Sequence, residues 1–204
     1  VYALDRTVEV AGLGPVRYDV AYGGAFYAFC QAEEVGVGLG PENFRELIDA
    51  GMAIKRAVMA SLPIHHPVEA DLGFLYGTIF TGAAHNPAHH SRNVCIFADG
   101  EVDRSPTGTG VSASAALHFA RKEIALGEAF TVESILGTTF TGAVTETIRG
   151  QVGDLDLKAD EMPTLEHANG IALAKTAPFF AACMESAAIL LDAGEDRRQA
   201  AREI

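Results

Sequence analysis

The sequence contains few cysteines and no tryptophan. Its three cysteines, Cys30, Cys95 and Cys183, are far apart in a chain of 204 residues, and each has apolar neighbours. This spacing excludes a disulfide framework and the paired ligands of a structural zinc site. Cysteine usage of this kind is typical of a reducing compartment, so we expect the protein to be cytoplasmic.

Basic residues are also scarce, since 15 Lys and Arg stand against 27 Asp and Glu, for a formal net charge of −12. This balance argues against a surface that binds nucleic acid or an anionic membrane. The most apolar stretch, 171–191, contains Lys175, Pro178 and Glu185, which disfavour a membrane span. The chain starts at Val1 without a charged-then-apolar leader, and we expect it to be a fragment or a trimmed product.

Hydrophobic residues make up 49% of the chain, which predicts a globular fold with one large or two small domains. A helical spacing of apolar residues predicts an amphipathic helix from Pro41 to Leu62, ended by Pro63. The pair Gly23-Gly24 predicts a bend or a close approach of two backbones. Apolar and alternating runs predict strands over residues 7–10, 16–22, 25–31, 73–80, 92–97, 130–136 and 138–148.

The most informative stretch is D-R-S-P-T-G-T-G, residues 103–110, followed by an uncharged run of small residues to Ala120. The run predicts a helix, over about 108–126, that is buried on every side. Free N–H groups of Gly108, Thr109 and Gly110 at its start would favour a carboxylate or a phosphate. Asp103 would receive an ammonium group, so the stretch predicts a site for a zwitterion such as an amino acid. A plain tight turn before a buried helix stays open as the alternative.

Other candidate side chains favour structural interpretations. The cluster of His85, His89 and His90 lies in a loop interrupted by proline, so we favour a solvated loop over a metal site. His118 lies on the predicted helix, where a hydrogen-bonded core histidine is a better interpretation than a base. Ser112 lacks the context of a nucleophile elbow, and no phosphate-loop lysine follows the glycines.

The stretch 103–110 resembles the proline racemase family, whose pattern here is D-R-S-P-C-G-T-G. Segments 19–28, 91–97 and 133–142 add further matches in the order of that family. The resemblance covers residues 1–150, which it identifies as the second lobe of a proline-racemase-like fold, and it fades over 151–204, a divergent and mainly helical C-terminal segment. It implies an α+β, diaminopimelate-epimerase-like lobe of mostly antiparallel strands wrapped around the buried central helix, with an atypical helical tail.

The resemblance also implies a chemistry. The first half of the family carries an M-C-G-H motif whose cysteine is one of two catalytic bases, and this sequence has no such motif. Thr107 occupies the position of the second cysteine, and a threonine hydroxyl cannot exchange a proton as a thiol does. Racemisation needs a base and an acid on opposite faces of the α-carbon. The resemblance therefore favours a lyase of amino-acid metabolism, a hydro-lyase that dehydrates trans-3-hydroxy-L-proline to pyrroline-2-carboxylate.

Matching positions imply the roles of the site residues. Thr107 would be the catalytic-site residue, Asp103 would bind the ring nitrogen, the N–H groups of Gly108 and Thr109 would bind the carboxylate, and Phe97 would form an apolar wall. The resemblance implies a small-molecule substrate, hydroxyproline or proline, with no metal or organic cofactor, and it leaves a homodimer open. Two alternatives remain: a proline or 4-hydroxyproline racemase or epimerase, and a catalytically inactive amino-acid-binding fragment.

Overall fold

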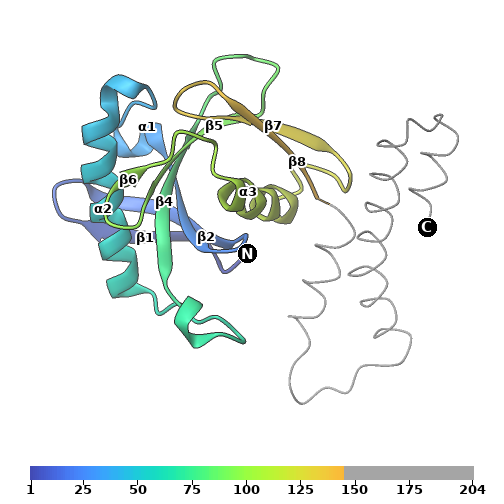
Figure 1. Cartoon of the computed structure of the whole chain (residues 1–204). Helices are drawn as coiled ribbons and strands as arrows, with labels where there is room; N and C mark the ends of the chain where they lie inside the picture. Colours follow the sequence, from blue (N-terminus) through green and yellow to red (C-terminus); the bar gives the residue numbers. More distant parts are fainter. Residues whose placement is uncertain (145–204) are drawn as a thin grey trace, which may run out of the picture. The chain divides into compact units, whose positions relative to one another are not determined.

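An eight-stranded sheet runs through the part of the chain that the structure, a computed structural model, describes: residues 1–144 (Figure 1). Strand order is β1-β2-β3-β4-β5-β7-β8, and the short β6 pairs with β5. The main strands, whose bounds follow, agree with those predicted from the sequence to within a few residues at their ends. The strands are β1 (Ala3–Val10), β2 (Gly14–Tyr22), β3 (Phe26–Gln31), β4 (Leu75–Gly82), β5 (Ser91–Phe97), β6 (Glu101–Val102), β7 (Ala129–Glu133) and β8 (Thr139–Ala143).

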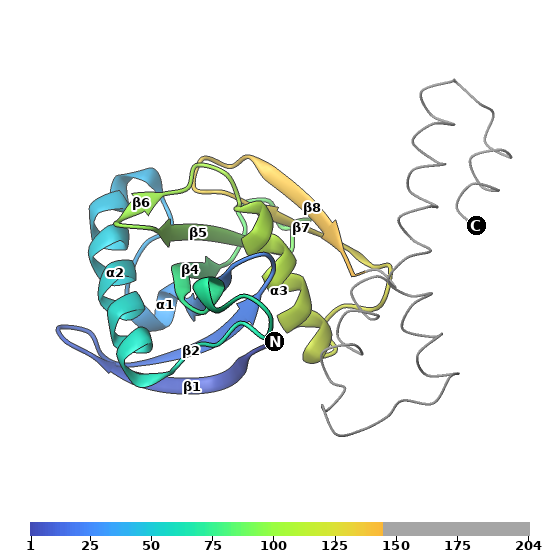
Figure 2. The same cartoon turned by 60° about the horizontal axis from the view of Figure 1, so that its bottom comes forward.

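Helices α2 and α3 lie on opposite faces of this sheet (Figures 1 and 2). The sheet is mostly antiparallel, but β3 pairs with β4, and β5 with β7, in parallel. A parallel pair needs a crossover connection, which α2 supplies for the first pair and α3 for the second. The helices are α1 (Ala32–Val35), α2 (Phe44–Ser61) and α3 (Gly108–Ala120), with 3-10 turns at Pro41–Asn43 and Ala70–Leu72.

Each face of the sheet carries its own apolar layer. The layer on the α2 side includes Leu47, Ile54 and Val58, which are fully buried and confirm the amphipathic helix predicted there. Gly51 lets α2 approach the sheet, because a Cβ at Gly51 would lie 2.7 Å from the side chain of Ile96. The layer on the α3 side consists of Ala21, Tyr27, Phe29, Ile79, Cys95, Ala113 and Leu117.

Helix α3 is shorter and more exposed than the sequence predicted. It ends at Ala120 rather than near residue 126, and a turn with Lys122 at φ +60° and Gly127 at φ +78° follows it. Ala113 and Leu117 are buried, whereas Ser112 and Phe119 on other sides are exposed. The prediction of burial on every side was wrong because an uncharged surface was taken for a buried one. Contacts of α3 with both β2 and β8 show that the sheet curls around the helix.

Residues Val1–Ala143 form one compact unit. The helical, acidic and frayed segments predicted after residue 150, the end of the last predicted strand and Cys183 lie outside the described residues. Within the described part, no helix is long and apolar enough to cross a membrane.

Candidate functional site at the start of helix α3

Asp103 organises the turn that leads into α3. Its N–H donates to the carbonyl of Cys95 at 3.0 Å, which attaches the turn to β5. Its carboxylate accepts the N–H of Ser105 at 2.8 Å on Oδ1 and the hydroxyl of Thr107 at 2.9 Å on Oδ2. Asp103, which was predicted to bind an ammonium group, is therefore also the residue that closes this turn. An aspartate can accept the backbone N–H two residues further on, so Asp103 is itself a local signal for such a turn.

Thr107 is held in an unusual backbone conformation directly before the helix. It is 7% exposed, and its φ of +67° is rare for a β-branched residue. Its carbonyl accepts the N–H of Val111 at 2.7 Å, so the helix begins immediately after it. Its hydroxyl donates to Asp103 and does not cap the helix. The N–H groups of the first helical turn are consequently left for another partner.

The N–H groups of Gly108 and Thr109 have no hydrogen-bond partner within residues 1–144. Both residues are exposed, and a Cβ at Gly108 would meet no atom within 4 Å. Unpaired N–H groups at the positive end of a helix favour an anion. Gly110 has a different purpose, because a Cβ there would lie 2.5 Å from Cδ1 of Ile79. It lets the helix pack on the sheet.

A row of aromatic rings lies on the same face of the sheet as the helix. Phe97, the predicted wall residue, is half-buried, and its ring lies 5.6 Å from that of Tyr76. The ring of Tyr76 lies 5.9 Å from that of Tyr27, whose hydroxyl is 2.7 Å from Oγ1 of Thr109. Neither tyrosine was predicted from the sequence to lie near the site. Neither has a motif of its own, and their shared face follows only from the pairing of β3 with β4.

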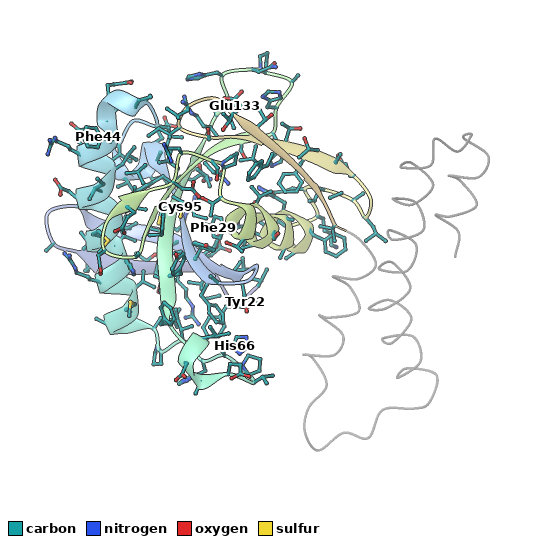
Figure 3. All side chains as sticks on the ribbon, viewed as in Figure 1. Tyr22, Phe29, Phe44, His66, Cys95 and Glu133 are labelled. Carbon is teal, nitrogen blue, oxygen red and sulfur yellow. The ribbon has the colours of Figure 1, made fainter. Side chains whose placement is uncertain are left out.

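The two described cysteines are not suited to act as bases. Cys95, on the sheet in Figure 3, is 1% exposed, and burial raises the pKa of its thiol to about 12. The neighbouring side chain of Thr107 offsets part of this rise. Burial, and then the nearby Asp19, likewise raise the pKa of Cys30 to about 12. Both thiols are therefore protonated at neutral pH and are poor nucleophiles and poor bases.

The histidine-containing loop between β4 and β5 is anchored by Glu133, labelled on β7 in Figure 3. Its carboxylate accepts the N–H groups of Asn86 and His85, each at 2.9 Å, and lies 2.8 Å from Nδ1 of His89. The bond from Asn86, and then that from His85, lower the pKa of Glu133 to about 2 against the opposing effect of burial. Most of the loop is exposed, as predicted, whereas its buried anchor was not predicted from the sequence. Among the described residues, no three His, Cys, Asp or Glu side chains converge on a metal position.

The C-terminal end of α3 is held by side chains. His118 bonds Glu123 at 2.6 Å through Nδ1 and lies 3.3 Å from Nε2 of His90. It is hydrogen-bonded, as predicted, but half-buried rather than in the core, because it lies in the last turn of the helix, where neighbouring residues are exposed. Arg121 donates to Asp19 at 2.7 and 2.9 Å. An open pocket of about 620 Å³ lies at this end, and its lining includes Asp19, Ser114, His118 and Arg121.

Comparison with known proteins places these features in a family. The model of the family described as proline racemase matches residues 1–157. The chain is 53% identical over 148 residues to a trans-3-hydroxy-L-proline dehydratase of Colwellia psychrerythraea, covering 72% of this chain and 42% of that protein. It is 42% identical over 175 residues to the human protein of the same name, covering 84% of this chain and 49% of that protein.

Among solved structures, a hydroxyproline epimerase from Agrobacterium vitis with bound trans-4-hydroxy-L-proline superposes with a TM-score of 0.65 and 34% identity. The match covers 69% of this chain and 40% of that protein. The chain thus spans less than half the length of these relatives. Together with the mixed α/β architecture, the match of residues 1–157 shows that the chain belongs to the proline racemase family.

Proposed function

We propose that this chain supplies one lobe of a trans-3-hydroxy-L-proline dehydratase, a hydro-lyase that forms pyrroline-2-carboxylate. The observation that carries the proposal is Thr107, which replaces the cysteine of the D-R-S-P-C-G-T-G pattern and donates its hydroxyl proton to Asp103. Two relatives, 53% and 42% identical, bear the name of this activity and support the choice.

Substrate would bind at the N-terminus of α3. The unpaired N–H groups of Gly108 and Thr109 would receive part of its carboxylate, where the helix dipole favours negative charge. Asp103 accepts two hydrogen bonds within the turn, and a carboxylate offers about four lone-pair positions. It therefore keeps acceptor capacity for the charged ring nitrogen, and Phe97 would contact the apolar side of the ring.

The reaction removes the α-proton and the 3-hydroxyl group. The C–H electron pair becomes the C2–C3 double bond, the C3–O bond breaks with its electron pair on oxygen, and the proton and hydroxide leave as water. The resulting enamine tautomerises to pyrroline-2-carboxylate. Negative charge grows on the carboxylate as the α-proton departs, and the N–H groups of Gly108 and Thr109 would stabilise it.

The base would come from the half of the protein that carries M-C-G-H, because both described thiols are buried and protonated. Thr107 would face the substrate from the opposite side. Its hydroxyl cannot return a proton to the α-carbon as a thiol would, so inversion stops and elimination of the hydroxyl proceeds. Thr107 would then hold the substrate near the leaving hydroxyl.

The same proposal includes a diaminopimelate-epimerase-like arrangement of two lobes, with residues 1–150 as the second lobe and 151–204 as a divergent segment. It also includes a cytoplasmic enzyme that needs neither metal nor organic cofactor and that acts as a monomer or a homodimer. The alternative is an epimerase or racemase, favoured by the fold neighbour that binds trans-4-hydroxy-L-proline. A binding lobe without activity of its own is the other alternative.

The test combines this chain with a separately expressed N-terminal half of a proline racemase family member that carries M-C-G-H. Each half alone and the mixture are incubated with trans-3-hydroxy-L-proline, trans-4-hydroxy-L-proline and L-proline. We expect pyrroline-2-carboxylate to form only when the two halves are mixed, and only from trans-3-hydroxy-L-proline. A matched N-terminal half with its cysteine changed to serine should give no product. Epimer from the 4-hydroxy substrate, without dehydration, would instead establish the epimerase.

A further inference from the structure

The hairpin between β2 and β3 meets Thr109 on three sides. A Cβ at Gly23 would lie 2.3 Å from the carbonyl oxygen of Thr109, and a Cβ at Gly24 would lie 2.8 Å from its methyl carbon Cγ2. The hydroxyl of Tyr27 lies 2.7 Å from Oγ1 of Thr109. The backbone carbonyl, the methyl group and the hydroxyl of one residue are thus each in contact with this hairpin.

Tyr27 is the polar member of the three contacts, and it is immobilised. Its side chain is 1% exposed, on β3 opposite Gly77 of β4. The ring packs against Tyr76, with centroids 5.9 Å apart, and against Phe29, with centroids 6.5 Å apart. Burial raises the pKa of its hydroxyl to about 12, so the hydroxyl keeps its proton at neutral pH. A close-packed ring therefore presents a neutral hydroxyl at a constant position.

We propose that Tyr27 is a positioning residue: through its hydrogen bond to Thr109 it fixes the first turn of α3, so that the unpaired N–H groups of Gly108 and Thr109 converge on a carboxylate. The carbonyl contact limits the backbone of Thr109, and the methyl and hydroxyl contacts limit its side-chain rotamer. N–H groups that are already oriented bind an anion without a further ordering cost. The identity of the ligand rests on the proposed function, whereas the positioning of Thr109 does not.

The proposal goes beyond a local contact because Tyr27 also supports the opposite side of the site. Its ring backs Tyr76, whose ring lies 5.6 Å from that of Phe97, the proposed wall. The ring of Tyr27 thus serves the wall, while its hydroxyl serves the anion-binding turn. Tyr27→Phe separates the two, since it keeps the ring and removes only the hydrogen bond.

The test uses NMR on the isotopically labelled 204-residue chain. Three-bond couplings to Cγ2 report the Thr109 rotamer, and titration with L-proline, followed at the Gly108 and Thr109 amide signals, reports affinity. We expect Tyr27→Phe to average the rotamer and to weaken L-proline binding roughly 3- to 10-fold, the effect of one hydrogen bond. Thr109→Val should weaken binding to a similar degree, and adding Tyr27→Phe to it should have little further effect.

The matched control is Tyr18→Phe, which removes a hydroxyl from a tyrosine that is 4% exposed in the layer on the α2 side. It should change neither the Thr109 rotamer nor the affinity. A fixed rotamer or an unchanged affinity in Tyr27→Phe would overturn the positioning role. If the unaltered chain does not bind L-proline, ligand binding by the isolated lobe fails while the mixed-halves experiment still decides the proposed function, and an averaged rotamer in Tyr27→Phe would still support the positioning of Thr109.

Discussion

The two ends of helix α3 are built in opposite ways. At the N-terminal end, the N–H groups of Gly108 and Thr109 have no partner within the described residues, and Thr107 is held at a positive φ. At the C-terminal end, Arg121 binds Asp19 through paired hydrogen bonds, and His118 binds Glu123. The N-terminal end leaves hydrogen-bond donors unpaired among the described residues, whereas side-chain hydrogen bonds hold the C-terminal end in place. We call the first the open end and the second the tied end. The pocket at the tied end is therefore a weaker candidate for the site of the reaction than the turn at the open end.

The largest effect should come from Asp103→Ala at the open end. The change removes the acceptor for the hydroxyl of Thr107 and for the N–H of Ser105, together with the proposed ligand of the ring nitrogen. Loss of charge-assisted hydrogen bonds predicts roughly 10- to 100-fold weaker binding of L-proline, measured by titration calorimetry. Asp71→Ala, in an exposed turn, is the matched control and should bind as the unaltered chain does. Equal affinity of the two variants would remove Asp103 from the site.

Gly23→Ala tests how tightly the open end is supported. The new methyl group would lie 2.3 Å from the carbonyl of Thr109 and 2.4 Å from the backbone nitrogen of Ala113, so the hairpin or the helix must move. Overpacking of this kind costs about 1–3 kcal/mol, which urea denaturation would measure. Gly108→Ala, where the backbone has no positive φ and a Cβ meets no atom within 4 Å, shows the cost of a substitution at a glycine without a clash or backbone strain. A Gly23→Ala chain as stable as the Gly108→Ala chain would contradict the close approach.

Glu133→Gln tests the anchoring of the loop that brings His90 to His118 at the tied end. Glutamine cannot accept the same hydrogen bonds with a charged carboxylate. We therefore expect the free energy of unfolding to fall by about 1–2 kcal/mol at pH 6. The pKa of Glu133 in the folded chain, about 2, is below its ordinary value of 4.5. Its contribution to stability is therefore present above pH 4.5 and is lost as the pH falls towards 2. The stability difference between the two chains should shrink over this range, and a constant difference in urea denaturation would contradict the role of its charge.

The smallest effect should come from Arg121→Gln. Its guanidinium is partly exposed and pairs with the exposed Asp5 and with the buried Asp19. Solvent screens the pair with Asp5, and the amide of glutamine keeps a donor for Asp19. We expect a loss of about 0.5–1 kcal/mol in the free energy of unfolding, with L-proline affinity unchanged. Thermal unfolding and calorimetry on the same sample would check both values. A clear loss of affinity would break the distinction between the two ends of the helix.

Much of the open end could be predicted from the sequence because its determinants are local. The glycines that expose N–H groups, the small residues of the helix and Asp103 lie within a few positions of one another. Gly23-Gly24 also predicted a close approach, although not that its partner is Thr109. Composition did not predict the exposed side of α3, because small uncharged residues are compatible with either environment.

The supporting residues could not be predicted, because their contacts join distant parts of the chain. Tyr27 and Thr109 are separated by 82 positions, and Glu133 and Asn86 by 47. Before the strands are paired, a tyrosine in an apolar strand is only a core residue, and a glutamate at the end of a strand is only a surface charge. Their roles depend on the order β3-β4-β5-β7, which no single segment specifies.

The two apolar layers on opposite faces of the sheet also have a consequence for how this protein can vary. Substitutions among Leu47, Ile54 and Val58 act on the far side of the sheet from the proposed site. A library directed to that layer should yield proteins that differ in thermal tolerance but share one ligand preference. A library directed to Tyr27, Phe29 and Cys95 should change both properties together. Engineering for robustness and engineering for a new substrate would therefore start from different faces of the same sheet.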